Sequence, residues 1–322
     1  MIEAVMIGKA QECFFPYAVE QDLSASLGAL RAEAGLAGLP PAVERINRLL
    51  SSAPVDLRSL GESVKEAPGL AEEAVKLCNA SLFELSQPVA SVEQAVIIMG
   101  ADIVRTLILT CWLTRYTGEN IPGQDSRAFW GHSLLVAKLS QHMCQWAGFA
   151  QPEWAFLAGL FHDLGAVPFL TLLARDRGRA RQGLFEIVGD SVEAQRRRFD
   201  TDHCELGLQI GINLGLSAPL VEVMARHHQR GGMLSSMPLL AFVCAAEAIA
   251  QDTKPGEASL PQAQLVRNAL AEFMPGLTPQ AGPGLIETLE ADLRASAEVV
   301  EEATDALPEV PQDAPTPARQ ED

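Results

Sequence analysis

Apolar residues recur every three or four positions along most of the chain, which is the spacing of one face of an α-helix. Leu57, Leu60 and Val64 show this spacing, and Leu70 and Ala74 continue it. We find no sustained alternation of apolar and polar residues between hairpin turns, the pattern that indicates β-strands. The sequence therefore predicts an all-α fold, a helical bundle of two packed subdomains built from short helices.

Turn-forming residues divide this helical pattern into segments. A Gly-Leu-Pro-Pro run ending at Pro41 opens the first helical unit, the polar stretch 117–123 is expected to be the loop that closes it, and Asp252 to Gly256 closes the second. The predicted divisions are an N-terminal extension (1–35), an N-terminal helical subdomain (36–125), a second helical subdomain (126–252), C-terminal helices (253–306) and a disordered acidic tail (307–322). The tail is rich in Pro, Ala and acids, a composition that buries too little apolar area to offset chain entropy. An extra helix and a dimer contact both remain open for residues 1–35.

Composition narrows the class of protein. Hydrophobic residues make up 48% of the 322 residues and charged residues 20%, which is typical of a soluble globular protein. The formal net charge is −17, and about half of it lies in residues 285–322. Broad nonspecific binding to nucleic acid is unfavourable for such a chain, so no direct nucleic-acid partner is expected.

The cysteines and the apolar stretches of the sequence indicate the cellular compartment of the protein. The six cysteines are scattered and form no Cys-x-x-Cys pair, which favours a reducing compartment over a disulfide framework. The first residues lack the basic start of a secretory signal. The most apolar stretch, 95–113, contains Asp102 and Arg105, so it is better interpreted as a buried helix than as a membrane span. We expect a cytoplasmic protein without a membrane partner.

Five of the six histidines border apolar helix faces. Residues three or four apart share a face, and these five each stand at that spacing from apolar residues: His132, His162, His203, His227 and His228. The sixth, His142, has an ambiguous face. A single buried histidine is usually a neutral core residue bonded to a carbonyl, and this interpretation remains open for each position. Five together are explained by one metal site, because neutral imidazole is a common ligand of transition metals.

Two acids fit the same interpretation. Asp163 follows His162 near an expected helix end, where Gly165 and Pro168 follow. Glu247 borders an apolar stripe, and an inward carboxylate needs a metal or a histidine as its partner. The small residue Gly159 would let another helix approach closely at this place.

Local strings around these residues resemble one family. The matching segments are 39–43, 78–83, 88–95 with 99–100, 130–133, 158–165, 202–207 and 227–228. Together they resemble the HD-related output domain, HDOD, of the HD superfamily of metal-dependent phosphohydrolases, and the resemblance covers roughly residues 36–250. The strongest matches contain Trp130-Gly131-His132-Ser133 and Phe161-His162-Asp163.

The resemblance implies a bacterial signal-transduction module that acts through binding, with signalling proteins as partners. A nucleotide ligand and a homodimer are further options. It also implies a divalent metal (Fe, Mn, Zn or Mg) held at the positions His132, His162, Asp163 and Glu247, with a second ion at His203 and His227 or His228. The alternative is an active metal-dependent phosphohydrolase, a phosphodiesterase in which Asp163 has the catalytic role.

The sequence departs from the active members of the superfamily at three places. Ala166 stands where they have a lysine, which removes a cation that could stabilise phosphoryl charge. The segment 229–232 lacks their Gly-Tyr-Pro element, and Glu247 stands where aspartate is usual. We therefore expect a site that binds metal without turnover, and we favour the regulatory module over the enzyme and over a purely structural role.

A basic segment precedes His203. Seven arginines lie between residues 175 and 198, and Arg196, Arg197 and Arg198 are candidates for binding a phosphate or an acidic partner. A solvated helix face explains the same pattern. The chain's own acidic tail is a third interpretation of what this segment binds.

Overall fold

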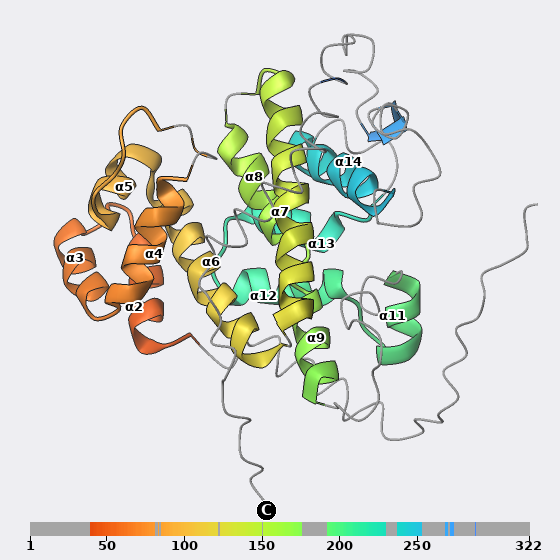
Figure 1. The fold of residues 1–322 in the computed structure, drawn as a ribbon, viewed down its shortest axis with the longest axis horizontal. Coiled ribbons are helices and arrows are strands. Elements are labelled where there is room, and N and C mark those ends of the chain that lie inside the picture. The colour runs from red at the N-terminus through yellow and green to blue at the C-terminus, as the bar shows by residue number, and fades with distance from the viewer. Residues whose placement is uncertain are drawn as a thin grey trace, which may run out of the picture.

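The computed structural model describes residues 39–80, 83, 85–121, 123–149, 151–175, 192–229 and 237–252, with a few more between 268 and 287. All regular structure in these ranges is helical, and the prediction of an all-α fold is confirmed (Figure 1). The N-terminal extension, the acidic tail and most of the predicted C-terminal helices lie outside the described residues.

Five helices form one side of the molecule, at the left of Figure 1. They are α2 (Pro41–Leu50), α3 (Leu57–Lys65), α4 (Pro68–Cys78), α5 (Val92–Met99) and α6 (Ala101–Asn120). Two of them, α3 and α5, begin at residues that cap helices: the Asp56 side chain accepts from the backbone N–H groups of Arg58 and Ser59, and Ser91 accepts from Gln94 N–H. Side-chain oxygens at these positions satisfy donors that a helix start leaves unpaired.

The remaining helices form the rest of the described structure. They are α7 (Gly123–Trp146), α8 (Pro152–Phe161), α9 (Ala166–Arg175), α11 (Val192–Phe199), α12 (His203–Asn213), α13 (Ala218–Arg226) and α14 (Pro238–Asp252). Helix α7 packs against both α8 and α14 (Figure 1). The side chain of Asn47 on α2 joins the two sides by donating to the carbonyl of Leu214, 3.0 Å away.

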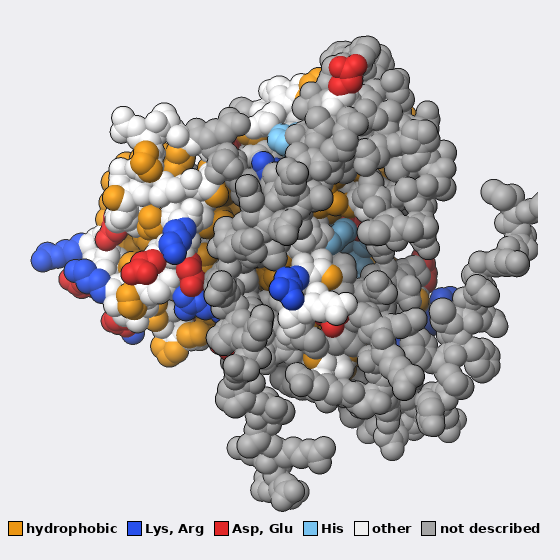
Figure 2. Space-filling model, viewed as in Figure 1, with side chains coloured by type: hydrophobic (Ala, Val, Ile, Leu, Met, Phe, Trp, Pro, Cys, Tyr) orange, Lys and Arg blue, Asp and Glu red, His pale blue; other side chains and the backbone are white. Residues whose placement is uncertain are grey.

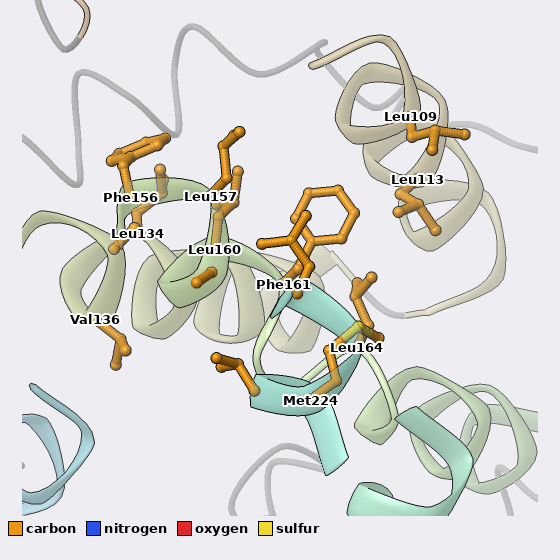
Figure 3. Packing of buried hydrophobic residues seen from close by; sticks show 14 of the residues in the cluster. Leu109, Leu113, Leu134, Val136, Phe156, Leu157, Leu160, Phe161, Leu164 and Met224 are labelled. Atoms are coloured by element: carbon orange, nitrogen blue, oxygen red, sulfur yellow. The ribbon is translucent and has the colours of Figure 1, made fainter. Parts of the chain in front are cut away.

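The core continues to the ends of α8 and α13. Phe161, Leu164 and Met224 are almost completely buried and lie near one another, as Figure 3 shows. Each such burial contributes about 1.5–3 kcal/mol relative to exposure. This packing fixes the turn that follows α8, where the first candidate site residues stand.

Two glycines allow close approach of the elements that carry those residues. A Cβ atom on Gly159 would lie 2.5 Å from Ala137 Cα, so α8 packs directly on the backbone of α7, as its sequence suggested. A Cβ atom on Gly165 would lie 1.7 Å from the carbonyl oxygen of His203. Any larger residue at Gly165 therefore pushes the start of α12 away.

The expected loop at 117–123 is wrong for its first part, because α6 continues to Asn120. Thr117 accounts for the difference. Its hydroxyl donates to Thr114 O (3.0 Å) and accepts from the indole N–H of Trp130 (2.9 Å), so this polar side chain is satisfied inside the core. The first residues of this stretch have the composition of a turn, but tertiary contacts hold them in a helix.

One run of residues, Pro152–Ala174, is apolar and long enough to cross a membrane. Most of its apolar window, 83%, is buried inside the fold. It forms α8, a turn and α9, and it contributes core residues on both helices. Burial of this kind is typical of the core of a soluble protein.

Candidate metal centre

The histidines and acids singled out in the sequence converge at the junction of five helices. His132 is on α7, His162 ends α8, His203 begins α12, His227 ends α13 and Glu247 is on α14. Asp163 and His228 adjoin His162 and His227 in the chain. His228 is exposed and His132 is half-buried, so solvent has access to part of this centre. Figure 2 shows histidine side chains at the surface of one face.

The first group contains two imidazoles and one carboxylate. The Nε2 atoms of His132 and His162 are 3.3 Å apart. The Oε2 atom of Glu247 is 2.9 Å from Nε2 of His132 and 3.2 Å from Nε2 of His162. The other carboxylate oxygen accepts from Gln251, one turn further along α14, at 2.6 Å, and this bond orients the carboxylate. Glu247 thus reaches the site despite its extra methylene.

The second group is richer in imidazoles. The Nε2 atoms of His203 and His227 are also 3.3 Å apart. The ring of His228 lies 4.3 Å from that of His227 and 4.8 Å from that of His203, between centroids. Asp163 Oδ1 is 3.8 Å from Nε2 of His203, and the rings of His162 and His227 are 4.9 Å apart. The two groups are therefore neighbours.

The far ring nitrogens fix the tautomers of three histidines. Nδ1 of His162 is 2.6 Å from Gly159 O, and Nδ1 of His227 is 3.2 Å from the carbonyl oxygens of Val223 and Met224. Since a carbonyl only accepts, each Nδ1 carries the hydrogen. Nδ1 of His203 likewise donates to the side-chain amide oxygen of Gln195, 2.8 Å away. In the neutral rings, Nε2 therefore presents a lone pair to the centre.

These residues fit a divalent metal. Lone pairs that face each other at 3.3 Å repel unless a cation lies between them, and hydrogen-bonded Nδ1 atoms are typical of histidine ligands. Bonds of about 2.0–2.1 Å place tetrahedral ligands about 3.3 Å apart, and octahedral neighbours about 2.9 Å apart. The distances within the first group, 2.9 to 3.3 Å, span this range. Oε2 of Glu247 is buried and has no hydrogen bond of good geometry.

The first group also forms a charge pair without metal. Burial disfavours the charged forms of both Glu247 and His162, but their mutual attraction outweighs it. Proximity of the His132 and His162 imidazoles holds the pKa of Glu247 well below its usual range. The nearby carboxylate raises the pKa of His162 against the effect of burial. Without metal, these shifts of the pKa values of Glu247 and His162 favour an ionised carboxylate beside a protonated imidazole.

In the second group, the surroundings lower the pKa of a histidine instead of raising it. Burial first, and then the charges of His228, His162 and His203, lower the pKa of His227 well below its usual value. Burial likewise raises the pKa of the neighbouring Cys204 thiol. Cys204 lies close enough to His203, His227 and His228 to join a ligand set, but its thiol is protonated at neutral pH, which argues against a cysteine nucleophile.

Other candidates lie outside the centre. His142 is ten residues beyond His132 on α7, about 15 Å along the helix axis, and it joins neither group.

Among the described residues of the basic segment, Arg197 and Arg198 are exposed, and Arg196 contacts the carboxylate of Asp202. Arg177, Arg179 and Arg181 lie outside the described residues. A hollow of about 380 Å³ between α5, α6 and α8 contains none of the candidate ligands.

Sequence reasoning missed Gln195, which is the buried residue of α11 and contacts His203. It stands three residues after Val192 and four before Phe199, but this spacing within α11 does not show that its partner is on another helix. Ala166 is completely buried at the start of α9, so the position where active relatives have a lysine faces the core here.

Two features identify the class of protein. The described chain is all-helical, and histidines and carboxylates meet between its helices. The HDOD domain family model matches residues 36–230, and the chain belongs to this family, as its motifs indicated. No curated protein matches the sequence.

Solved structures share the fold. An HDOD domain protein of unknown function from Geobacter sulfurreducens has a TM-score of 0.59 and 22% identity, and the match covers 89% of this chain and 99% of that one. A protein provisionally described as a phosphohydrolase, from Shewanella amazonensis SB2B, has a TM-score of 0.58 and 19% identity, with coverage of 85% and 97%. A second protein of that organism, provisionally described as a metal-dependent phosphohydrolase, has a TM-score of 0.52 and 16% identity, with coverage of 85% and 99%.

Proposed function

We propose that this HDOD protein is a regulatory module of bacterial signal transduction that holds one or two divalent transition-metal ions and acts by binding a signalling partner. The observation that carries the proposal is the pair of facing imidazoles in each group, with Nε2 atoms 3.3 Å apart. Such an arrangement in a member of this family is best explained by ion binding.

His132, His162 and Glu247 would hold one ion. His203 and His227 would hold the other, with His228 beside them and Asp163 between the two groups. The ions would supply positive charge to the centre and join α7, α8, α12, α13 and α14. The chain's own contribution is to aim the Nε2 atoms and to exclude most of the solvent, since His162, His203 and His227 are buried.

Absence of turnover is supported by Ala166. A lysine at this place would supply a cation for phosphoryl charge, whereas Ala166 has a small apolar side chain packed in the core. The described residues after His228 also offer no tyrosine for substrate contacts; Gln229 follows, and it bonds to Arg226 at 2.8 Å. Exposed Arg197 and Arg198 are candidates for contact with an acidic partner or a phosphate group.

The alternative is a metal-dependent phosphohydrolase, which the retained ligand set favours. A bound divalent ion lowers the pKa of water and polarises a phosphoryl oxygen. Asp163, at the junction of the two groups, is the residue that would orient the attacking oxygen. A leaving-group donor is not evident among the described residues of the centre.

The test is metal content combined with turnover. Purified protein is analysed for Fe, Mn, Zn and Mg and then assayed with phosphoesters and cyclic nucleotides in Mn²⁺, Fe²⁺ or Mg²⁺. We expect bound metal and no turnover above that of Asp163→Ala. Asp102→Ala, at an exposed carboxylate outside the centre, is the matched control. Turnover that Asp163→Ala abolishes while the variant stays folded would establish the enzyme instead, and protein that binds no metal would remove both proposals.

A further inference from the structure

Helix α11 buries a single polar side chain. Gln195 is 4% exposed, whereas its neighbours Arg196, Arg197 and Arg198 face solvent. A buried amide is costly unless it is hydrogen-bonded, so its contacts explain why a glutamine is here. Both contacts that are seen for its oxygen go to one residue, His203.

The amide oxygen of Gln195 accepts twice from His203. The backbone N–H of His203 donates to Oε1 at 2.8 Å, and Nδ1 of its ring is also 2.8 Å from Oε1. A backbone N–H can only donate, so the amide oxygen and not its nitrogen must face His203. Nδ1 therefore carries the ring hydrogen, and the lone pair of Nε2 points to His227.

His203 depends on another helix for this orientation, unlike two of its neighbours. His162 and His227 donate to carbonyls three or four residues earlier in their own helices. His203 is the first residue of α12, and a helix start has no preceding turn to supply such a carbonyl. Gln195 provides the missing acceptor from α11.

Adjacent residues connect the same two helices again. Asp202 is completely buried and caps α12 by accepting from Glu205 N–H at 2.9 Å. Arg196 contacts the other carboxylate oxygen of Asp202. Beyond these contacts, Phe199 packs edge-on against Phe169 with centroids 5.0 Å apart. Among the residues that the structure describes, α11 is thus held mainly through the first turn of α12, and a short helix with few buried contacts opens at low cost.

We propose that Gln195 is the positioning residue that aims His203 at the centre and that this bond couples ion occupancy to the docking of α11. The inference rests on the proposed function, because it needs an ion at His203. An ion on Nε2 makes Nδ1–H a stronger donor, so it strengthens the bond to Gln195. By linkage, a docked α11 strengthens ion binding by the same factor. The module would then report its metal state through an exposed arginine-bearing helix.

Three variants test the coupling. Gln195→Met keeps the length and volume of the side chain but removes the acceptor. Gln195→Glu keeps an acceptor oxygen and loses the amide donor. Glu193→Gln, on the exposed face of the same helix, is the matched control. Zn²⁺ and Mn²⁺ titrations give the number and affinity of ions, ¹⁵N spectra of the imidazoles give the tautomer of His203, and hydrogen exchange gives the protection of α11.

For wild type, Gln195→Glu and Glu193→Gln, we expect two ions, an Nδ1–H tautomer and slower exchange of α11 on metal addition. For Gln195→Met, we expect the second ion to bind about 10- to 100-fold more weakly and α11 protection to become independent of metal. Two results would refute the coupling and leave the proposed function intact. One is that folded Gln195→Met binds both ions with the affinities of wild type, and the other is that the exchange of α11 in wild type does not depend on metal. Wild type without metal would refute both.

Discussion

The Nε2 atoms of His203 and His227 face each other at 3.3 Å, and each ring is held by a hydrogen bond on its opposite nitrogen. Residues 24 positions apart in the chain are thereby aimed at one point. The arrangement predicts what each ring contributes to ion binding.

Removal of one ring from each pair should remove one ion. We expect His227→Asn to retain about one equivalent of Zn²⁺ or Mn²⁺ where wild type retains two, because His203 would lose the imidazole that its Nε2 atom faces at 3.3 Å. His132→Asn should do the same for the other group, since Glu247 and His162 would remain alone. Metal analysis after gel filtration measures both. His142→Asn is the control, and wild-type stoichiometry in His227→Asn would contradict the assignment.

Shortening the carboxylate of Glu247 should weaken the first group. Its Oε2 atom is 2.9 Å from His132 and 3.2 Å from His162, and aspartate would withdraw the carboxylate by about one bond length. We expect Glu247→Asp to bind the first ion at least about tenfold more weakly, as calorimetric titration would show. Glu222→Asp, on the partly exposed surface of α13, serves as the control. Unchanged affinity would show that Glu247 is not a ligand.

A methyl group at Gly165 should displace α12. Its Cβ would lie 1.7 Å from the backbone oxygen of His203, and backbone cannot yield as a flexible side chain does. We expect Gly165→Ala to lower the free energy of unfolding by about 3 kcal/mol or more. Urea denaturation measures this, with Gly123→Ala, where a Cβ meets nothing within 4 Å, as the reference.

The metal-free protein should lose stability in mild acid through His227. Burial and neighbouring imidazoles lower its pKa in the folded state, so below its ordinary value of 6.5 the unfolded ring takes up a proton and the folded ring does not. Stability then falls as pH drops from about 6.5, by at most ~1.4 kcal/mol per pH unit for this group. In chelator, His227→Gln should show a shallower loss between about pH 7.5 and 5.5 than wild type. An identical slope in both proteins would disprove this role for His227.

Much of the centre could be predicted because its residues follow helical periodicity. His132, His162 and Glu247 each stand at helix spacing from apolar neighbours, and that spacing placed them inside. Gln195 also stands at helix spacing, three residues after Val192 and four before Phe199, but its partner His203 is on another helix, which the spacing within α11 does not show. The loop expected at 117–123 was assigned from local composition, which does not register the contact from Trp130 that holds Thr117 in α6. The ligand roles and the predicted division into subdomains stay predictions.

His132 and Glu247 come from helices far apart in the chain, yet their side-chain atoms are 2.9 Å apart. An ion shared by them would act as a reversible cross-link, closing a long loop as a disulfide does. The five buried cysteines among the described residues are free and form no such link. Metal supply would then set the resistance of this protein to unfolding and proteolysis, and with it the cellular lifetime of the protein.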